Sequence, residues 1–271
     1  MERIKEAIAK AKEKQSGSFP VRGKAASKVA RNAEIIDRPI VYDQTRVIDL
    51  DITHLEANRI ITLDSEDPNS ISFDILRTQV LAKMEANNWR TLAITSPTPA
   101  CGKTVVAINL ALSIAKQTDY TALLVDFDLR RPQVASYLGL PIENSFADYL
   151  DGKIEFNDAL VNPGIPRFVV LPNRRPVKNS TEILTSPKVK SMVVDLRDRY
   201  EKRICIFDLP PLKATDDAIA FLPQVDCVLM VVASGETKPS EVKECRRQLQ
   251  SSNLLGVVLN KSQEVEKTYY Y

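Results

Sequence analysis

One short stretch, residues 92–116, constrains the fold of this chain more than any other. An apolar run at 92–94 leads into the loop Thr95-Ser96-Pro97-Thr98-Pro99-Ala100-Cys101-Gly102-Lys103-Thr104, and a helical pattern follows from Val105 to Lys116. A Gly-Lys-Thr triplet between a strand and a helix is typical of loops that hold a nucleoside triphosphate. The stretch therefore predicts an α/β fold with a phosphate site at a strand end.

The residues of this loop suit different tasks in a phosphate site. Backbone N–H groups of the loop and of the helix start point at phosphate oxygens in such sites. Lys103 adds a mobile positive charge, and the hydroxyl of Thr104 is able to ligate Mg²⁺. The general pattern requires glycine where Pro97 stands. The triplet alone therefore does not establish the site. The expected nucleotide-binding residues here are Pro99, Ala100, Cys101, Gly102, Lys103, Thr104 and Val105.

Strand-like and helical segments alternate along the rest of the chain. We expect strands at 120–127, 169–172, 204–207, 227–232 and 254–259, and helices at 70–87, 187–200, 217–222 and 240–251. Near-continuous apolar strands that alternate with helices predict a parallel sheet covered on both faces. Ligands of such sheets bind at the carboxyl ends of the strands.

Acidic residues follow two of these predicted strands, on the same edge as the phosphate loop. Asp208 comes after four apolar residues and is placed to hold Mg²⁺, directly or through water. Asp126 and Asp128 suit a phosphoryl transfer in which one carboxylate holds metal and the other accepts a proton from an incoming hydroxyl. The alternative is that Asp126 and Asp128 only cap the next helix.

Other polar residues near these strand ends leave two interpretations open. Arg130 either balances the acidic pair or contacts phosphate. Asp217 either lines the loop after Pro211 or caps a short helix. Asn260, at the end of the last strand, either hydrogen-bonds adenine or ends the strand at a turn.

Composition excludes several classes of protein. The net charge of +2 over 271 residues gives no argument for nucleic-acid binding, and no apolar run approaches the 18 residues of a membrane span. The four cysteines show no paired spacing, which indicates buried thiols. The single histidine, His54, makes a Ser–His–Asp triad or a structural zinc site improbable.

The two ends of the chain differ from its middle. Residues 1–31 carry nine Lys or Arg and three Asp or Glu, and residues 2–14 suggest a short helix. This arm is either a solvated tail or a surface for anionic lipid or an acidic partner. We divide the chain into a basic arm (1–60), a phosphate-loop domain (61–262) and a flexible tail (263–271). The tail ends in Tyr269, Tyr270 and Tyr271, which are either phosphate acceptors or an accidental sticky terminus.

Together these motifs resemble a known family. The segments Thr95-Ser96-x-x-Pro99-x-x-Gly102-Lys103-Thr104, Val125-Asp126-x-Asp128-x-Arg130 and Phe207-Asp208-x-Pro210-Pro211, followed by terminal tyrosines, resemble the bacterial tyrosine kinases of capsule and exopolysaccharide synthesis. The resemblance covers about residues 70–271 and implies a three-layer α/β P-loop NTPase fold with a mainly parallel sheet.

The resemblance also implies a function. It implies a protein-tyrosine autokinase that uses ATP and Mg²⁺ to phosphorylate Tyr269, Tyr270 and Tyr271 of a neighbouring subunit, and so regulates polymer synthesis and export. Carried over, Lys103 and Thr104 bind phosphates and metal, Asp126 is the base or a metal helper, and Asp128 and Asp208 complete the metal site. Implied partners are a membrane chain-length determinant, a cognate tyrosine phosphatase and further copies of the chain. The implied location is cytoplasmic, at the inner face of the plasma membrane.

The sequence departs from the family pattern at several positions. Ala100 replaces a loop glycine and Cys101 a common glutamate, and only Arg77 matches the family's Glu-x-x-Arg-x-x-Arg oligomer motif, with Ile71 and Asp74 at the other places. A partitioning or positioning ATPase, which switches on hydrolysis without kinase activity, is the alternative. Such proteins usually carry a second lysine early in the loop, where Ser96 and Pro97 stand here. A nucleotide-binding regulatory module without turnover is a third possibility.

Overall fold

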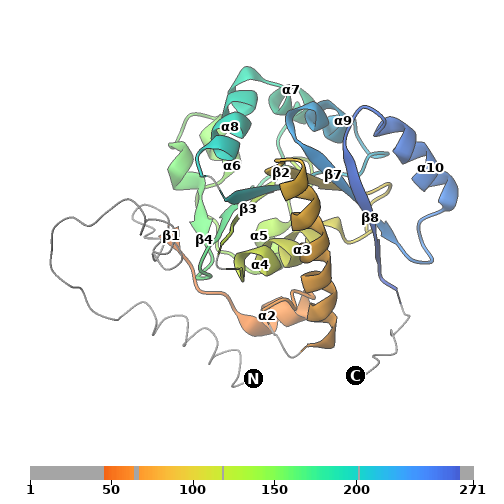
Figure 1. Cartoon of the computed structure of the whole chain (residues 1–271). Coiled ribbons are helices and arrows are strands. Elements are labelled where there is room, and N and C mark those ends of the chain that lie inside the picture. Colours follow the sequence, from red (N-terminus) through yellow and green to blue (C-terminus); the bar gives the residue numbers. More distant parts are fainter. Residues whose placement is uncertain (1–45, 64–66, 118, 201, 263–271) are drawn as a thin grey trace, which may run out of the picture.

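The computed structural model describes residues 46–63, 67–117, 119–200 and 202–262. Within them, an eight-stranded sheet runs in the order β1-β4-β5-β3-β6-β2-β7-β8 (Figure 1). The strands are β1 (Arg46–Val47), β2 (Thr91–Thr95), β3 (Thr121–Asp126), β4 (Val161–Asn162), β5 (Phe168–Leu171), β6 (Arg203–Asp208), β7 (Cys227–Ala233) and β8 (Leu254–Asn260). All neighbouring strands pair in parallel except β4 and β5, which are antiparallel. The predicted α/β fold with a mainly parallel sheet is confirmed.

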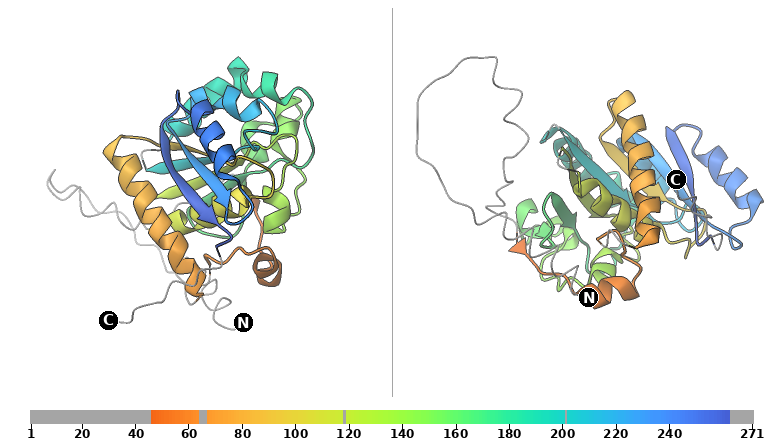
Figure 2. Two further views of the ribbon diagram at one scale, coloured as in Figure 1. Left: turned by 90° about the vertical axis from the view of Figure 1, so that its right-hand side faces the viewer. Right: turned by 60° about the horizontal axis from the view of Figure 1, so that its bottom comes forward.

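Helices cover both faces of the sheet, which gives three layers (Figure 2). One face packs against α2 (Ile52–Ala57), α3 (Pro68–Ala86), α4 (Lys103–Ala115) and α5 (Val134–Leu138). The other packs against α6 (Phe146–Leu150), the 3₁₀ turn η3 (Phe156–Ala159), α7 (Ser180–Leu184), α8 (Pro187–Asp198), α9 (Asp217–Phe221), the 3₁₀ turn η4 (Leu222–Gln224) and α10 (Pro239–Gln248).

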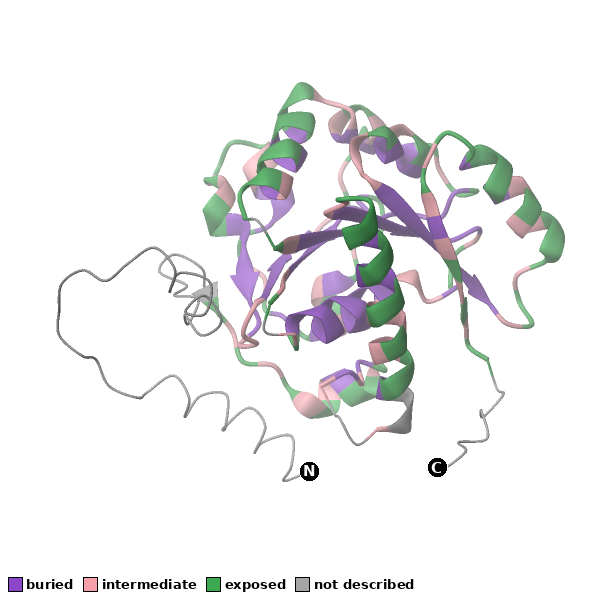
Figure 3. Cartoon of the chain, in the orientation of Figure 1, coloured by how far each residue is buried: buried purple, intermediate pink, exposed green. Residues whose placement is uncertain are grey.

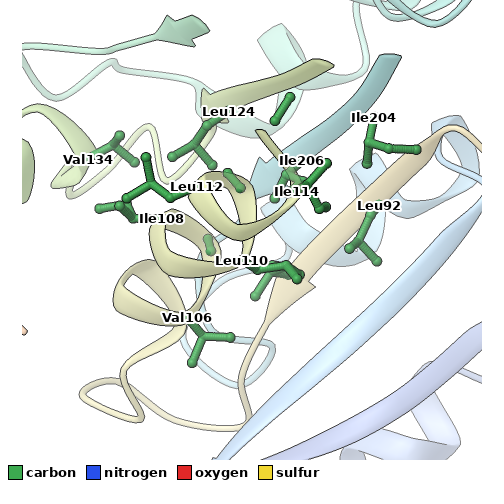
Figure 4. Close-up of a cluster of buried hydrophobic side chains, with 14 of the residues drawn as sticks. Leu92, Val106, Ile108, Leu110, Leu112, Ile114, Leu124, Val134, Ile204 and Ile206 are labelled. Carbon is green, nitrogen blue, oxygen red and sulfur yellow. The ribbon is translucent and has the colours of Figure 1, made fainter. Parts of the chain in front are cut away.

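The central strands are apolar on both sides because each side meets a different core. In β3, Leu124 packs under α4 while Leu123 packs in the cluster beneath α8 and α9. The helix α4 is itself buried almost throughout, and Figure 4 shows its side chains, Ile108 and Leu112 among them, in one cluster with side chains of the strands and of α5. Figure 3 shows the same contrast, with a buried central sheet and α4, and exposed outer surfaces on α3, α8 and α10. This packing holds the start of α4, and so the phosphate loop, against the sheet.

The register of the parallel strands brings the acidic residues together. Asp126 is the last residue of β3 and lies opposite Asp208, the last residue of β6. Asp208 in turn lies opposite Ile94 on β2, directly before the phosphate loop. The predicted meeting of these strand ends is therefore a consequence of sheet register.

A segment that the sequence analysis assigned to the arm packs on the domain. β1 extends the sheet beside β4, and Leu55 and Ile60 are buried in the core. Asn109 on α4 fixes the end of this segment. Its Oδ1 accepts hydrogen bonds from Thr62 N at 3.0 Å and Thr62 Oγ1 at 2.8 Å, and its Nδ2 donates to the carbonyl of Arg59 at 3.0 Å. A boundary at residue 60 thus cuts through a docked segment.

Most predicted elements agree with the structure to within a few residues. The helix expected at 70–87 runs from Pro68 to Ala86, and the strand expected at 254–259 is Leu254–Asn260. All four cysteines are buried and unpaired, as expected. In the described part of the chain, no helix has the length and apolarity to cross a membrane. The helix predicted at 2–14 and the tail at 263–271 lie outside the described residues.

Candidate active site

A cavity of about 480 Å³ opens beside the phosphate loop, at the carboxyl ends of β2, β3 and β6. Its walls come from the loop, from the segment after β3 with α5, and from the turn after β6. The lining residues are Pro99, Ala100, Gly102, Lys103, Thr104, Asp128, Arg130, Arg131, Gln133, Tyr137, Pro210, Pro211, Ala214 and Thr215. This volume suits a nucleotide-sized ligand.

Lys103 lies at the centre of the charged groups in this cavity. Its Nζ is 2.9 Å from Asp128 Oδ2 and 3.3 Å from Asp208 Oδ1. The Thr104 hydroxyl donates to Asp208 Oδ2 at 2.6 Å. Burial opposes the ammonium charge, but the carboxylates of Asp208 and Asp128 outweigh burial and raise the pKa of Lys103. The lysine is therefore a fixed cation that pairs with two carboxylates.

Asp126 is buried behind this cavity. Its Oδ2 accepts hydrogen bonds from the backbone N–H groups of Gln133 at 3.0 Å and Val134 at 2.9 Å, at the start of α5. Its Oδ1 finds no hydrogen-bond partner among the described residues. Burial, followed by repulsion from Asp208, raises the pKa of Asp126 well above its usual value. One oxygen of Asp126 therefore bonds the start of α5, as in the capping alternative.

Asp128 and Asp208 differ from Asp126 in their contacts. Asp128 lines the cavity and also accepts a hydrogen bond from Arg131 N at 3.2 Å. Burial raises the pKa of Asp208, although Lys103 and Thr104 offset part of that effect. Both carboxylates touch the lysine and thus form one connected group with it.

The donor set fits Mg²⁺ bound together with a nucleotide. Among the described residues, no three His, Cys, Asp or Glu side chains gather as a complete metal cage. Mg²⁺ typically takes one or two carboxylates, several waters and the oxygens of substrate phosphates, and needs no such cage. The Thr104 hydroxyl and the carboxylate of Asp208, 2.6 Å apart, suit that incomplete set.

The phosphate loop contains two residues in the left-handed backbone region. Gly102 has φ +84° and immediately precedes α4, and a Cβ there would lie 2.2 Å from Asn260 Nδ2. Ala100 has φ +64° although it carries a Cβ. Ala100, which replaces a loop glycine of the family pattern, therefore strains the loop at this position.

Replacing Ala100 with glycine should stabilise the protein. Without a Cβ the left-handed conformation has no steric penalty, so we expect Ala100→Gly to raise the free energy of unfolding by about 1 kcal/mol. The matched control is Ala82→Gly, in the exposed interior of α3, which should lower it by about 1 kcal/mol. Urea denaturation of both variants measures the two shifts; a loss of stability in Ala100→Gly would contradict the strain.

The phosphate loop is anchored through Cys101, which contacts Asn260 and Thr237. Asn260 Nδ2 donates to the Cys101 carbonyl at 2.9 Å, and neither residue lines the cavity. Cys101 Sγ lies 3.6 Å from Thr237 Oγ1. The contact with adenine that was predicted for Asn260 stays a prediction, since its amide nitrogen serves the loop in this structure.

The turn after β6 is bonded to the phosphate loop. Thr95 Oγ1 donates to the Pro210 carbonyl at 2.8 Å, and Leu212 N donates to the Ser96 carbonyl at 2.8 Å. The stiff Pro210-Pro211 turn and the loop therefore form one wall of the cavity.

Arg130 and Asp217 come from two segments that are far apart in the sequence, and their side chains contact each other. Arg130 Nε is 3.0 Å from Asp217 Oδ2, and Arg130 Nη2 is 3.2 Å from Asp217 Oδ1. Asp217 is the first residue of α9 and not its N-cap, which is Asp216. The capping role considered for Asp217 is thus wrong. Arg130 was expected to balance Asp126 and Asp128 or to contact phosphate, whereas its guanidinium contacts Asp217 in this structure. No pattern in the sequence signals this pair.

Comparison with known proteins identifies related sequences, although no family model matches the chain. It is 28% identical over 206 residues to the putative tyrosine-protein kinase CapB of Staphylococcus aureus, covering 74% of this chain and 89% of CapB. It is 32% identical over 188 residues to the tyrosine-protein kinase etk of Escherichia coli strain K12. That match covers 68% of this chain and only 25% of etk.

Solved structures share the fold. The chimeric protein CapA2B2 superposes with a TM-score of 0.70 at 27% identity, over 81% of this chain and 94% of that protein. The septum site-determining protein MinD of Pyrococcus horikoshii, complexed with Mg-ADP, gives a TM-score of 0.55 at 20% identity, over 65% of this chain and 72% of MinD. The second likeness concerns the fold alone.

Proposed function

This chain belongs to the bacterial tyrosine kinases, and on that premise we propose that it transfers the γ-phosphate of ATP to tyrosines of its own carboxyl-terminal tail. The observation that carries the proposal is the cluster in the cavity, where Lys103 Nζ lies 2.9 Å from Asp128 and 3.3 Å from Asp208. The similarity to CapB of Staphylococcus aureus, a putative tyrosine-protein kinase, supports the kinase activity. We propose that this activity serves capsule or exopolysaccharide synthesis.

The residues of the cavity divide the work of phosphoryl transfer. The loop amides and Lys103 would bind the phosphates, and Thr104, Asp208 and Asp128 would hold Mg²⁺. The metal, when bound, neutralises charge that develops on the phosphoryl oxygens. Phosphoryl transfer depends mainly on such positioning and charge stabilisation, which suits a site rich in fixed charges.

Asp126 is our candidate for the proton acceptor. Its raised pKa increases its affinity for the proton of a tyrosine hydroxyl, and within the described part of the chain its Oδ1 has no hydrogen-bond partner. Its side chain does not line the cavity, so the proposal requires the wall to open toward Asp126 when substrates bind.

The acceptors Tyr269, Tyr270 and Tyr271 lie outside the described residues, and a neighbouring subunit is the proposed source of the tail. We also propose a membrane chain-length determinant as activating partner, a cognate tyrosine phosphatase, and recruitment of the cytoplasmic protein to the inner face of the plasma membrane. The likeness to the chimeric protein CapA2B2 supports the membrane partner.

Incubation of the purified protein with ATP and Mg²⁺ tests the proposal. We expect phosphotyrosine in the terminal peptide by mass spectrometry, and loss of most label when residues 269–271 are deleted. Each tyrosine changed singly to phenylalanine locates the acceptor. Label that is unchanged in the deletion would move the acceptor elsewhere. Release of ADP without phosphotyrosine would instead favour the alternative, a positioning-type ATPase. The chain and MinD share the fold.

A further inference from the structure

A second cavity, of about 550 Å³, adjoins the nucleotide cavity, and Arg130 belongs to the lining of both. The second cavity is lined by polar residues of the segment before and within α7, including Lys178, Asn179 and Thr181. Arg130 thus forms the wall between the two cavities. Arg130 follows Asp128 by two residues, and Asp128 contacts Lys103 of the phosphate loop.

The Arg130 guanidinium is held in place from one side. Asp217 accepts hydrogen bonds from Arg130 Nε at 3.0 Å and from Arg130 Nη2 at 3.2 Å, and the Ser180 hydroxyl is 3.1 Å from Nε. Such a two-point contact fixes both the position and the plane of a guanidinium. Half of the Arg130 side chain remains exposed, at 51%, while that of Asp217 is fully buried.

Asp217 is itself held by hydroxyl groups of α7. Ser180 Oγ donates to Asp217 Oδ2 at 2.7 Å, and Thr181 Oγ1 donates to Asp217 Oδ1 at 2.5 Å. Although burial raises the pKa of Asp217, hydrogen bonds from Arg130, Thr181 and Ser180 lower it below its usual value. The carboxylate therefore stays charged and saturated with donors, as a rigid support requires.

We propose that Asp217, supported by Ser180 and Thr181, is a positioning residue that fixes Arg130 where its guanidinium meets the phosphoryl group during transfer. The inference rests on the proposed function. Phosphoryl-transfer enzymes commonly place an arginine at this point to stabilise charge in the transition state. The fixed contact with Asp217 removes the need to order a flexible side chain in that step.

The chain contains a matched control for this arrangement. Arg174 contacts Asp148 at 3.1 and 3.0 Å through the same two nitrogens, and Ser145 Oγ donates to Asp148 at 2.7 Å. Asp148 is likewise buried, and Arg174 likewise half-exposed. Neither Arg174 nor Asp148 lines either cavity. We therefore expect Asp148→Asn to lower the stability of the fold as much as Asp217→Asn does, but to leave phosphoryl transfer unaffected.

A double-mutant cycle tests the proposal. We expect Arg130→Gln to lower kcat about 100-fold and Asp217→Asn about 10-fold or more, each with little change in the KM for ATP. In the Arg130→Gln background, Asp217→Asn should cause no further loss, because its effect acts through Arg130. Asp148→Asn should leave kcat unchanged, although its melting temperature falls like that of Asp217→Asn.

Two results would overturn the proposal: a wild-type kcat in Asp217→Asn, or an equal loss from Asp217→Asn with and without Arg130. Should Asp217→Asn fail to fold, Thr181→Val removes one donor to Asp217 and keeps the ion pair, and its smaller loss must also vanish in the Arg130→Gln background. If the wild type releases ADP without phosphotyrosine, the kinase proposal fails, and the same cycle on ADP release still decides whether Asp217 acts through Arg130.

Discussion

Replacing Lys103 with methionine abolishes both phosphotyrosine formation and ADP release in our account, by at least about 100-fold in kcat. The lysine is the cation that contacts both Asp128 and Asp208 in the cavity. Methionine keeps the length of the side chain but supplies no charge for phosphate. Lys153→Met, at an exposed lysine paired with Asp151, is the control and should retain activity. Retained turnover in Lys103→Met would show that the phosphate loop is misassigned.

The same variant should also be less stable, because it leaves buried carboxylates without their cation. Loss of one partner of a buried ion pair costs about 3–5 kcal/mol. The pKa of Asp208 is already raised by burial, and without Lys103 the folded state favours its protonated form further. Stability from a raised carboxyl pKa is greatest at low pH and is lost as the pH rises above the unfolded value. The deficit of Lys103→Met in melting temperature should therefore be smaller at pH 5 than at pH 8.

Replacing Gly102 with alanine should disrupt the phosphate loop. The new Cβ would lie 2.2 Å from Asn260 Nδ2, which also donates to Cys101, so the side chain cannot retreat without losing that bond. We expect a loss of about 1–3 kcal/mol in stability and at least about tenfold in nucleotide affinity. Isothermal titration with ADP and Mg²⁺ measures the affinity.

Gly152→Ala separates backbone strain from steric clash. Gly152 has a similar φ of +70°, but a Cβ there meets nothing within 4 Å. Its replacement should cost about 1 kcal/mol and leave nucleotide affinity unchanged. The double variant Gly102→Ala with Asn260→Ala removes the clash and should recover part of the loss. Equal behaviour of Gly102→Ala and Gly152→Ala would contradict a role for Asn260 beneath the loop.

The sequence was sufficient to predict the sheet and the charged cluster, for an identifiable reason. The apolar segments that end in Asp126 and Asp208 form the neighbouring parallel strands β3 and β6. Their register places the two aspartates opposite each other. Lys103 and Thr104 of the loop lie close to these aspartates because β2, which leads into the loop, pairs with β6. The strongest pattern in the sequence is thus the one that determines the cluster.

Other features depend on contacts that leave no local pattern. The two-residue strand β1 is placed by its pairing with β4. The residues after α2 are held by Asn109, which makes five hydrogen bonds with described residues that a helical pattern cannot reveal. The pair of Arg130 and Asp217 joins residues 87 positions apart. The sequence placed Asn260 at the end of the last strand but did not reveal its partner, because its side-chain amide donates to a backbone carbonyl, that of Cys101.

The central claim is that the cavity around Lys103 phosphorylates tyrosines of the tail, and a mixing experiment tests it most directly. Lys103→Met with an intact tail is combined with an active chain that lacks residues 269–271, and ATP and Mg²⁺ are added. Our account predicts phosphotyrosine in the terminal peptide of the Lys103→Met chain, seen by mass spectrometry, and none when either protein is incubated alone. ADP release by the shortened chain with no phosphotyrosine on its partner would contradict the claim.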